Sequence, residues 1–314
     1  MYGYKEVEKK LNKLLQKNKD RMTLDTIGLS LDNRKIYQVI LGNSNSKKHF
    51  LVQAGIHGRE YMTTYLVMKQ LEYYLDYYYI GRYKGIKYND LFDKVAFHLL
   101  PLTNPDGVTI SQSGISKLKN KKYRNIIKKC YIDDIKSKYT TLDFKNYLIR
   151  WKANARGVDL NRNFDAGFSE IKERDKASSE NYKGKSAESE PETKEIVKVT
   201  KSYDFAGTIS YHSSGSIIYW DYKDSLVKKE SSIMADIAKN ITGYNKALSD
   251  DEYENVMAGG YKDYASSKKD NPIPSLTIEI GKEESPLDFS EFKDIFDRNY
   301  LIFSAFAEYI EREY

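Results

Sequence analysis

The chain has 314 residues and a formal net charge of +6, with 51 lysines and arginines against 45 aspartates and glutamates. This modest positive charge is not gathered in an arginine-rich helix or an aromatic-basic motif, so the composition argues against a nucleic-acid-binding protein. The one cysteine, Cys130, excludes an intramolecular disulfide and a cysteine-rich structural metal site.

The N-terminal part of the chain is predicted to form a helix followed by strands. The helix is expected within residues 1–22, where leucines recur on one side. Residues 22–30 and 35–41 are apolar runs around an Asp-Asn turn, which is typical of a β-hairpin. The next predicted elements are a strand over 49–54, a helix over 61–75, a buried strand over 95–101 and a turn over 103–107.

The remaining elements continue to alternate between helix and strand. They are helices over 117–130, 142–151 and 190–202, a strand over 203–212, a second strand soon after it, a helix over 224–241, a strand over 274–281 and a closing helix over 289–311. This alternation is typical of the α/β class. Between the helices, residues 169–194 are the most polar segment and are expected to form a surface loop.

We expect one domain over residues 1–314, with its core over about 23–310, because no linker-like segment separates two cores. Residues 1–8 lack the apolar core of a signal peptide, and no apolar run approaches the ~20 residues of a membrane span. The sequence as written therefore predicts a cytoplasmic protein outside the membrane, or a cell-wall or extracellular protein if a signal has been removed. It leaves the oligomeric state open.

A histidine and a glutamate three positions apart, His57 and Glu60, lie where the strand over 49–54 turns into the next helix. An imidazole and a carboxylate placed there can converge on one metal ion. A catalytic zinc takes three protein ligands and leaves one position for water, so the pair predicts a third ligand elsewhere. His212, at the end of the strand over 203–212, is a candidate among the four histidines of the chain.

Glu279 lies inside the apolar, β-branched strand over 274–281. Burying an unpaired charge is costly, so this glutamate needs a partner or a function. It either pairs with a buried lysine or arginine, or serves as a general base beside the metal site. The two other histidines are expected to be structural: His98 is predicted to be a core residue and His49 to face solvent.

Five segments occur in the order found in the zinc metallocarboxypeptidase family, of which carboxypeptidases A and B are members. They are His57-Gly58-Arg59-Glu60, Thr103-Asn104-Pro105-Asp106-Gly107, Gly157-Val158-Asp159-Leu160-Asn161-Arg162-Asn163-Phe164, Ser210-Tyr211-His212 and Thr277-Ile278-Glu279. The chain resembles this family over residues 23–310. The resemblance implies a hydrolase with a central twisted mixed β-sheet flanked by helices.

The resemblance also implies the roles of the metal site. His57, Glu60 and His212 would bind one Zn²⁺ per chain, and Glu279 would be the general base and then the general acid. Asp159 would support the first zinc histidine from behind, a contact that typically changes metal affinity or activity about 10- to 100-fold.

Further positions would bind a peptide substrate. Arg59 would line the cleft, and Asn161 and Arg162 would hold a substrate carboxylate. The family's carbonyl-polarising arginine follows a tryptophan, but here Lys152 stands at that position and Arg156 is a nearby replacement. The family's mobile capping tyrosine also has no clean match. The two candidates in the right interval are Tyr253 and Tyr261.

A narrower resemblance is to the bacterial γ-D-glutamyl-meso-diaminopimelate peptidases, which cut peptidoglycan stem peptides. It is carried by residues 151–161, 212–220 and 259–264. Arg162 is retained here, which favours a substrate with a free carboxylate on the leaving residue. Lys262 aligns with the floor of the specificity pocket, where it suits an acidic side chain, or else it points to solvent at the start of a helix.

Three functions follow from these motifs. The first is a zinc peptidase acting on peptidoglycan stem peptides. The second is an ordinary carboxypeptidase acting on peptide C-termini. The third is a non-catalytic wall- or peptide-binding protein, which the presence of all three ligands and the base disfavours.

Overall fold

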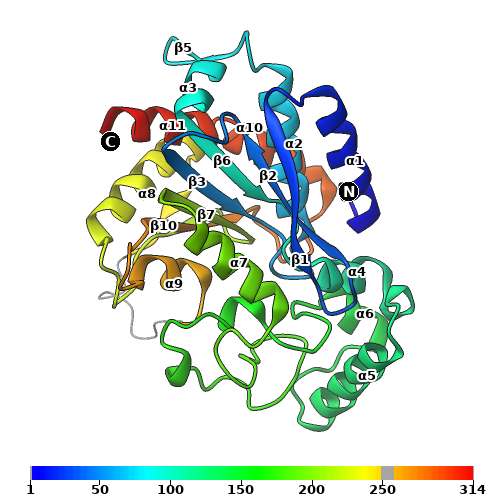
Figure 1. Cartoon of the computed structure of the whole chain (residues 1–314). Coiled ribbons are helices and arrows are strands. Elements are labelled where there is room, and N and C mark those ends of the chain that lie inside the picture. Colours follow the sequence, from blue (N-terminus) through cyan, green and yellow to red (C-terminus); the bar gives the residue numbers. More distant parts are fainter. Residues whose placement is uncertain (1, 249–257, 314) are drawn as a thin grey trace.

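A central mixed β-sheet forms the middle layer of the molecule (Figure 1). The computed structural model describes residues 2–248 and 258–313, and within these residues the sheet has eight strands in the order β1-β2-β6-β3-β7-β10-β8-β9. The strands are β1 Met22–Leu29, β2 Lys35–Leu41, β3 Lys48–Gln53, β6 Val95–Leu100, β7 Phe205–Ser213, β8 Ile217–Tyr219, β9 Asn245–Lys246 and β10 Ser275–Ile280. A separate small hairpin pairs β4 Arg82–Tyr83 with β5 Ile86–Lys87.

The four central strands, β6, β3, β7 and β10, run parallel to one another. They are apolar almost throughout because both faces of the sheet are covered. Their carboxyl ends therefore meet at one edge of the sheet, which is where open α/β sheets bind ligands. His57 and Glu60 follow β3 at this edge, and His212 and Glu279 lie near the ends of β7 and β10.

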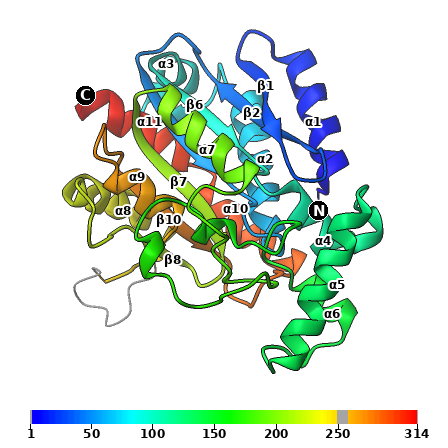
Figure 2. The ribbon, with the colours of Figure 1, turned by 60° about the horizontal axis from the view of Figure 1, so that its bottom comes forward.

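Helices cover both faces of the sheet, as Figures 1 and 2 show. One apolar core joins a sheet face to α2, α3, α8, α10 and α11, with α1 beside β1. A second core joins the other face to α7 and α9, and a third gathers α4, α5 and α6 around Trp151. The helices are α1 Tyr4–Lys17, α2 Tyr61–Asp76, α3 Tyr88–Lys94, α4 Pro105–Ser113, α5 Lys121–Lys136, α6 Phe144–Ile149, α7 Pro191–Ser202, α8 Lys228–Thr242, α9 Tyr261–Ser267, α10 Phe292–Asn299 and α11 Ile302–Glu313.

Within the described residues, none of these helices combines the length and the apolar composition needed to cross a bilayer. Short 3₁₀ turns connect several of the elements. They are Ile115–Lys117, Leu160–Arg162, Phe168–Glu170 and Phe289–Glu291.

The predicted α/β class and the N-terminal hairpin are confirmed, with β1 and β2 antiparallel as expected. Three details differ from the sequence prediction. The closing helix over 289–311 is broken into α10 and α11, the predicted turn at 103–107 is the start of α4, and α3 was not expected. The N-terminal helix ends at Lys17, and Met22 already belongs to β1.

The prediction that His49 faces solvent is wrong, because it is only 8% exposed. Its Nδ1 lies 2.9 Å from Nε2 of His98, whose Nδ1 lies 2.6 Å from the amide of Gln38. His98 is the core histidine that the sequence predicts, with no exposed surface. Burial and the neighbouring His49 lower the pKa of His98 to about 3, so this buried pair stays neutral.

Candidate metal centre and active site

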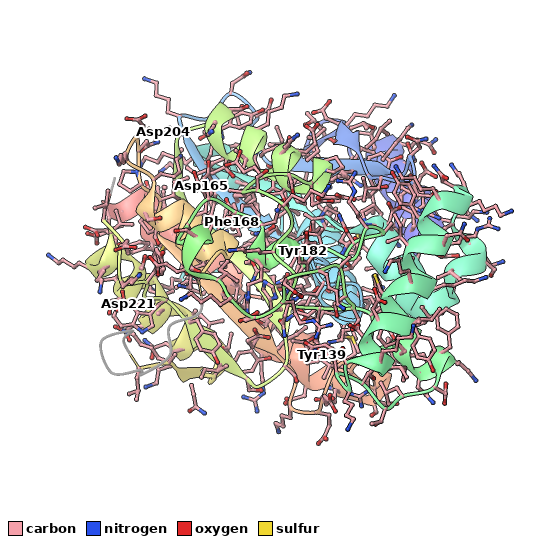
Figure 3. All side chains as sticks on the ribbon, turned by 90° about the horizontal axis from the view of Figure 1, so that it is seen from below. Tyr139, Asp165, Phe168, Tyr182, Asp204 and Asp221 are labelled. Atoms are coloured by element: carbon pink, nitrogen blue, oxygen red, sulfur yellow. The ribbon has the colours of Figure 1, made fainter. Side chains whose placement is uncertain are left out.

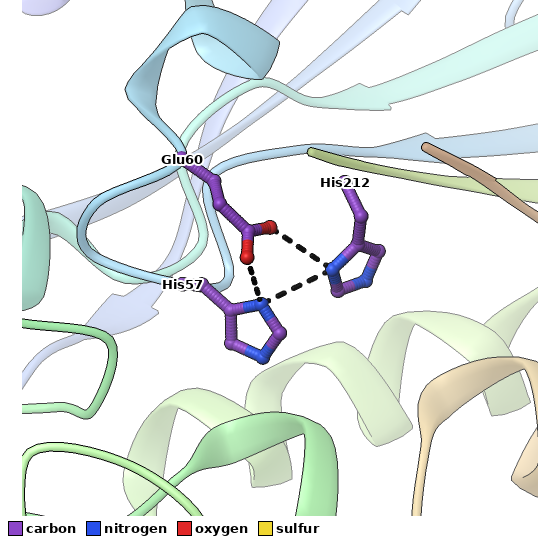
Figure 4. Close-up of side chains that lie close together, drawn as sticks. All are labelled: His57, Glu60 and His212. Carbon is purple, nitrogen blue, oxygen red and sulfur yellow. Dashed lines mark hydrogen bonds and ion pairs between the residues drawn. The ribbon is translucent and has the colours of Figure 1, made fainter. Parts of the chain in front are cut away.

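Three side chains meet at the carboxyl edge of the sheet, and Figure 4 shows how they face one another. His57 follows β3, Glu60 directly precedes α2, and His212 is the penultimate residue of β7. Nδ1 of His57 lies 2.8 Å from Oε1 of Glu60 and 3.1 Å from Nδ1 of His212, which lies 3.1 Å from Oε2 of Glu60. All three residues are buried.

The second nitrogens of the two imidazoles point away from this centre to other partners. Nε2 of His57 lies 3.2 Å from Oδ1 of Asp159, and Nε2 of His212 lies 3.3 Å from Oγ of Ser210. When these Nε2 atoms carry the protons, both Nδ1 lone pairs point at each other and at the Glu60 carboxylate. Three acceptors without a hydrogen between them require a cation, and this donor set and spacing fit zinc with its bonds of about 2.0–2.2 Å.

The charge of Glu60 is consistent with such a site. Burial alone would raise the pKa of Glu60, but the neighbouring His57 and His212 hold it well below its usual range. The carboxylate is therefore ionised and available as a ligand at neutral pH.

Close backbone packing positions the loop that carries His57. A Cβ atom on Gly58 would lie 2.6 Å from the backbone oxygens of both Gly107 and Trp151, so only glycine fits there. The Gly58 amide also donates to the carbonyl of Lys152. Asn104, the N-cap of α4, donates its side-chain amide to the carbonyls of Ile56 and Ala153 and so ties the same loop down.

Glu279 stands beside the metal centre on the neighbouring strand. In the parallel pairing of β7 and β10, Glu279 is the direct partner of His212, so the two side chains share one face of the sheet. Burial raises the pKa of Glu279 to about 7, a shift that His212 and Lys152 oppose. A carboxyl group near neutrality can both accept and release a proton.

Asp159 is buried behind His57 and is held by several donors. It accepts the backbone N–H groups of Asn161 and Asn181, and Nζ of Lys152 lies 3.8 Å from its Oδ2. Burial would raise the pKa of Asp159, but Lys152 and His57 hold it well below its usual range. Asp159 is therefore ionised, and its carboxylate orients the His57 ring through the contact with Nε2.

The structure separates the two candidates for the carbonyl-polarising cation. Lys152 lies next to Asp159 and close enough to lower the pKa of Glu279. Arg156 instead pairs with Glu190 at 3.1 Å, and its side chain is 42% exposed. Lys152 is therefore the better placed of the two candidates, because the guanidinium of Arg156 is directed to a different carboxylate.

Of the two capping tyrosines, Tyr253 lies outside the described residues. Tyr261 has no exposed surface, packs against Phe164 and shares a hydrogen bond of 3.0 Å with Thr200. Its assignment to substrate binding is corrected, because its hydroxyl is buried in the core beneath α7. Its backbone N–H donates to Oδ1 of Asn161 and so orients that side chain.

The remaining substrate-binding candidates all carry intramolecular partners. Nη2 of Arg59 lies 3.0 Å from Glu180, and Nε of Arg162 lies 3.2 Å from Oε2 of Glu173. Lys262 is buried, donates to the carbonyl of Asp221 and lies 2.6 Å from Oδ1 of Asp263.

The alternative in which Lys262 points to solvent is therefore wrong. Two of these partners were not anticipated: Glu173 lies in a polar loop without a recognisable motif, and Asp263 is a helix residue whose side-chain direction no local pattern indicates.

A model of the zinc carboxypeptidase family matches residues 7–312. The chain belongs to this family. Gamma-D-glutamyl-L-diamino acid endopeptidase 1 of Lysinibacillus sphaericus is 29% identical over 282 residues, which cover 89% of this chain and 65% of that protein. Mast cell carboxypeptidase A of Homo sapiens is 25% identical over 217 residues, which cover 67% of this chain and 44% of that protein. The chain thus spans less than two thirds of both relatives.

Solved structures show the same fold. Thrombin activatable fibrinolysis inhibitor superimposes with a TM-score of 0.76 at 20% identity, covering 100% of this chain and 75% of that one. Murein-tripeptide amidase MpaA of Escherichia coli O157 superimposes with a TM-score of 0.51 at 18% identity, covering 91% of each chain. The protein therefore has the fold of the zinc carboxypeptidase family.

Proposed function

We propose that this zinc carboxypeptidase relative hydrolyses the γ-D-glutamyl-diaminopimelate bond of peptidoglycan stem peptides, with one zinc ion held by His57, Glu60 and His212. The observation that carries the catalytic part is the convergence of these three ligand atoms beside Glu279. The similarity to the Lysinibacillus endopeptidase supports the substrate class. An ordinary carboxypeptidase activity is the second candidate, supported by the similarity to mast cell carboxypeptidase A.

The mechanism follows from the positions of the side chains. A bound zinc ion would supply a Lewis acid and lower the pKa of water toward ~7. Glu279 takes a proton from the attacking water and delivers it to the leaving nitrogen, a role that its pKa of about 7, raised by burial, suits. The Lys152 ammonium stabilises the carbonyl oxygen as that atom gains negative charge.

Recognition of the leaving residue involves three charged side chains, of which one binds its α-carboxylate and two bind the end of its side chain. Arg162 and Asn161 hold its α-carboxylate. At the position that aligns with the floor of the family's specificity pocket, the pair of Lys262 and Asp263 offers a cation and an anion 2.6 Å apart. The side-chain end of diaminopimelate carries both an ammonium and a carboxylate, so it complements this pair better than a lysine or an acidic side chain does.

A comparison of three tripeptides tests this substrate. L-Ala-γ-D-Glu-diaminopimelate should be cleaved at the γ-D-Glu bond with a kcat/KM about 10²-fold above that of peptides ending in lysine or in α-aminopimelate, which each lack one charge. Products are identified by mass spectrometry. Lys262→Gln should reduce this preference, because the amide removes the cation. Equal rates for the three peptides would contradict the diaminopimelate proposal and favour the ordinary carboxypeptidase.

Glu173 competes with the substrate for Arg162. The Glu173 carboxylate accepts a hydrogen bond from Nε of Arg162, so a substrate carboxylate that binds this nitrogen must displace Glu173. We expect Glu173→Gln to lower KM for the free tripeptide about fivefold and to leave KM for the same peptide with an amidated C-terminus unchanged. The magnitude is modest because Glu173 is 36% exposed and such contacts are worth about 1 kcal/mol or less.

Glu170→Gln is the matched control for this prediction. Glu170 precedes Glu173 in the same loop but pairs with Lys223 instead of Arg162. This variant should leave both KM values as in the wild type. An equal change for the free and amidated peptides in Glu173→Gln would show that Glu173 does not compete for a carboxylate.

A further inference from the structure

A cavity of about 560 Å³ lies away from the metal centre, between the C-terminal ends of α7 and α9. Its wall includes Tyr203, which comes just before β7, whereas His212 is near the other end of that strand. At about 3.3 Å per strand residue, roughly 20 Å of β7 separate the two sites. Figure 3 labels Asp165, which lines the cavity, and Asp204 beside Tyr203.

One side of the cavity carries two lysines, and the carboxylates of Asp204 and Asp270 lie near one of them, Lys268. Lys201 and Lys268 both line it, and neither has an ion pair in residues 2–248 and 258–313. Burial and the neighbouring Lys201 lower the pKa of Lys268, so the two ammonium groups lie close enough to repel each other. An anion between them would remove this repulsion.

Another part of the wall carries the opposite charge. The Tyr264 side chain is only 6% exposed, and its hydroxyl is buried without a hydrogen-bond partner among the described residues. Burial raises the pKa of Tyr264, and the nearby carboxylates of Glu188 and Asp165 raise it further. Neither carboxylate has an ion pair in the described parts of the chain. A buried hydroxyl near two such carboxylates lacks the partner that a ligand would supply.

We propose that this cavity is a second binding site for a small zwitterion of amino-acid to tripeptide size. The ammonium group of the ligand lies against Asp165, Glu188 and the Tyr264 oxygen, and its carboxylate lies between Lys201 and Lys268. The volume falls within the range of small-molecule sites. Tyr264 packs against Phe164, Phe164 packs against Tyr261, and the backbone of Tyr261 contacts Asn161. Phe164 and Tyr261 are fully buried, so these two rings separate the cavity from the proposed substrate-binding residue Asn161.

Three probes that share one central carbon chain test the charge requirement by calorimetry on the zinc-loaded protein. Diaminopimelate carries both charges, pimelate carries only the carboxylates, and 1,5-diaminopentane carries only the ammonium groups. We expect diaminopimelate to bind at least about 10-fold more tightly than the other two, since each lost charged hydrogen bond is worth about 1.5–3 kcal/mol. No measurable heat with diaminopimelate at millimolar concentration would overturn the proposal, as would equal affinity for all three probes.

Variants assign the binding to the cavity. The double variant Lys201→Met/Lys268→Met should weaken diaminopimelate binding at this site about 10-fold or more and leave stem-peptide hydrolysis unchanged. Tyr264→Phe, which keeps the ring packing, should also weaken binding. Arg162→Met should retain binding at the cavity, which separates this site from the proposed substrate cleft.

Lys198→Met is the matched control, because Lys198 lies on the same helix but is exposed and near Glu195. Its affinity for diaminopimelate should equal that of the wild type. Equal losses in Lys198→Met and in the double variant would mean that general surface charge is responsible, and undiminished binding in the double variant would place the zwitterion elsewhere.

Discussion

Replacing Glu279 by glutamine is expected to lower kcat for peptide hydrolysis by about 10³-fold or more, while zinc content and substrate affinity stay close to those of the wild type. The amide keeps the shape of the side chain beside His212 but cannot accept a proton from water. Proton transfer by a positioned side chain contributes about 10²–10⁴-fold, and here one group serves both the attack and the departure of the leaving nitrogen.

The measurement is steady-state hydrolysis of the stem tripeptide together with metal analysis of the same preparation. Glu283→Gln is a suitable control, because Glu283 is exposed in the loop after β10 and should leave kcat unchanged. A near-normal rate in Glu279→Gln would assign the general base to another residue. Loss of zinc along with activity would mean that Glu279 maintains the metal site rather than moving a proton.

Replacing His212 by alanine is expected to remove most of the zinc and with it the hydrolytic activity. His212 supplies one of three ligand atoms, and without it Glu60 and His57 form an incomplete site. The loss of zinc affinity should exceed the roughly 10- to 100-fold that removal of a supporting side chain behind a ligand costs. Metal analysis after dialysis measures this directly.

His49→Gln provides the control for a buried histidine outside the metal centre. His49 contacts His98 at the opposite end of the sheet, and glutamine can retain a hydrogen bond there. This variant should keep its zinc. Retention of stoichiometric zinc by His212→Ala would refute the assignment of the ligands.

Local sequence patterns predicted the class of the fold and the central residues of the site. Apolar runs bounded by turn residues located β3, β6, β7 and β10, because strands covered on both faces need continuous apolar side chains. His57, His212 and Glu279 were recognisable because each interrupts or ends such a run. A polar group in that place needs a functional or structural reason.

The partners of the charged groups could not be predicted, since the direction that each side chain takes in the folded chain decides which acid it meets. Glu173 forms an ion pair with Arg162, Asp263 with Lys262 and Glu190 with Arg156. No local pattern indicates which acid each cation meets. Packing decides these contacts, as it decides that Tyr261 faces the core.

The sequence by itself predicted the candidate zinc ligands and the candidate proton-transfer group, because those properties belong to the side-chain types and to their places at strand ends. The tertiary structure alone decided which cations remain available to a substrate and where lysines gather without a direct ion pair among the described residues, as at Lys201 and Lys268. These depend on distances between elements that only the folded chain brings together.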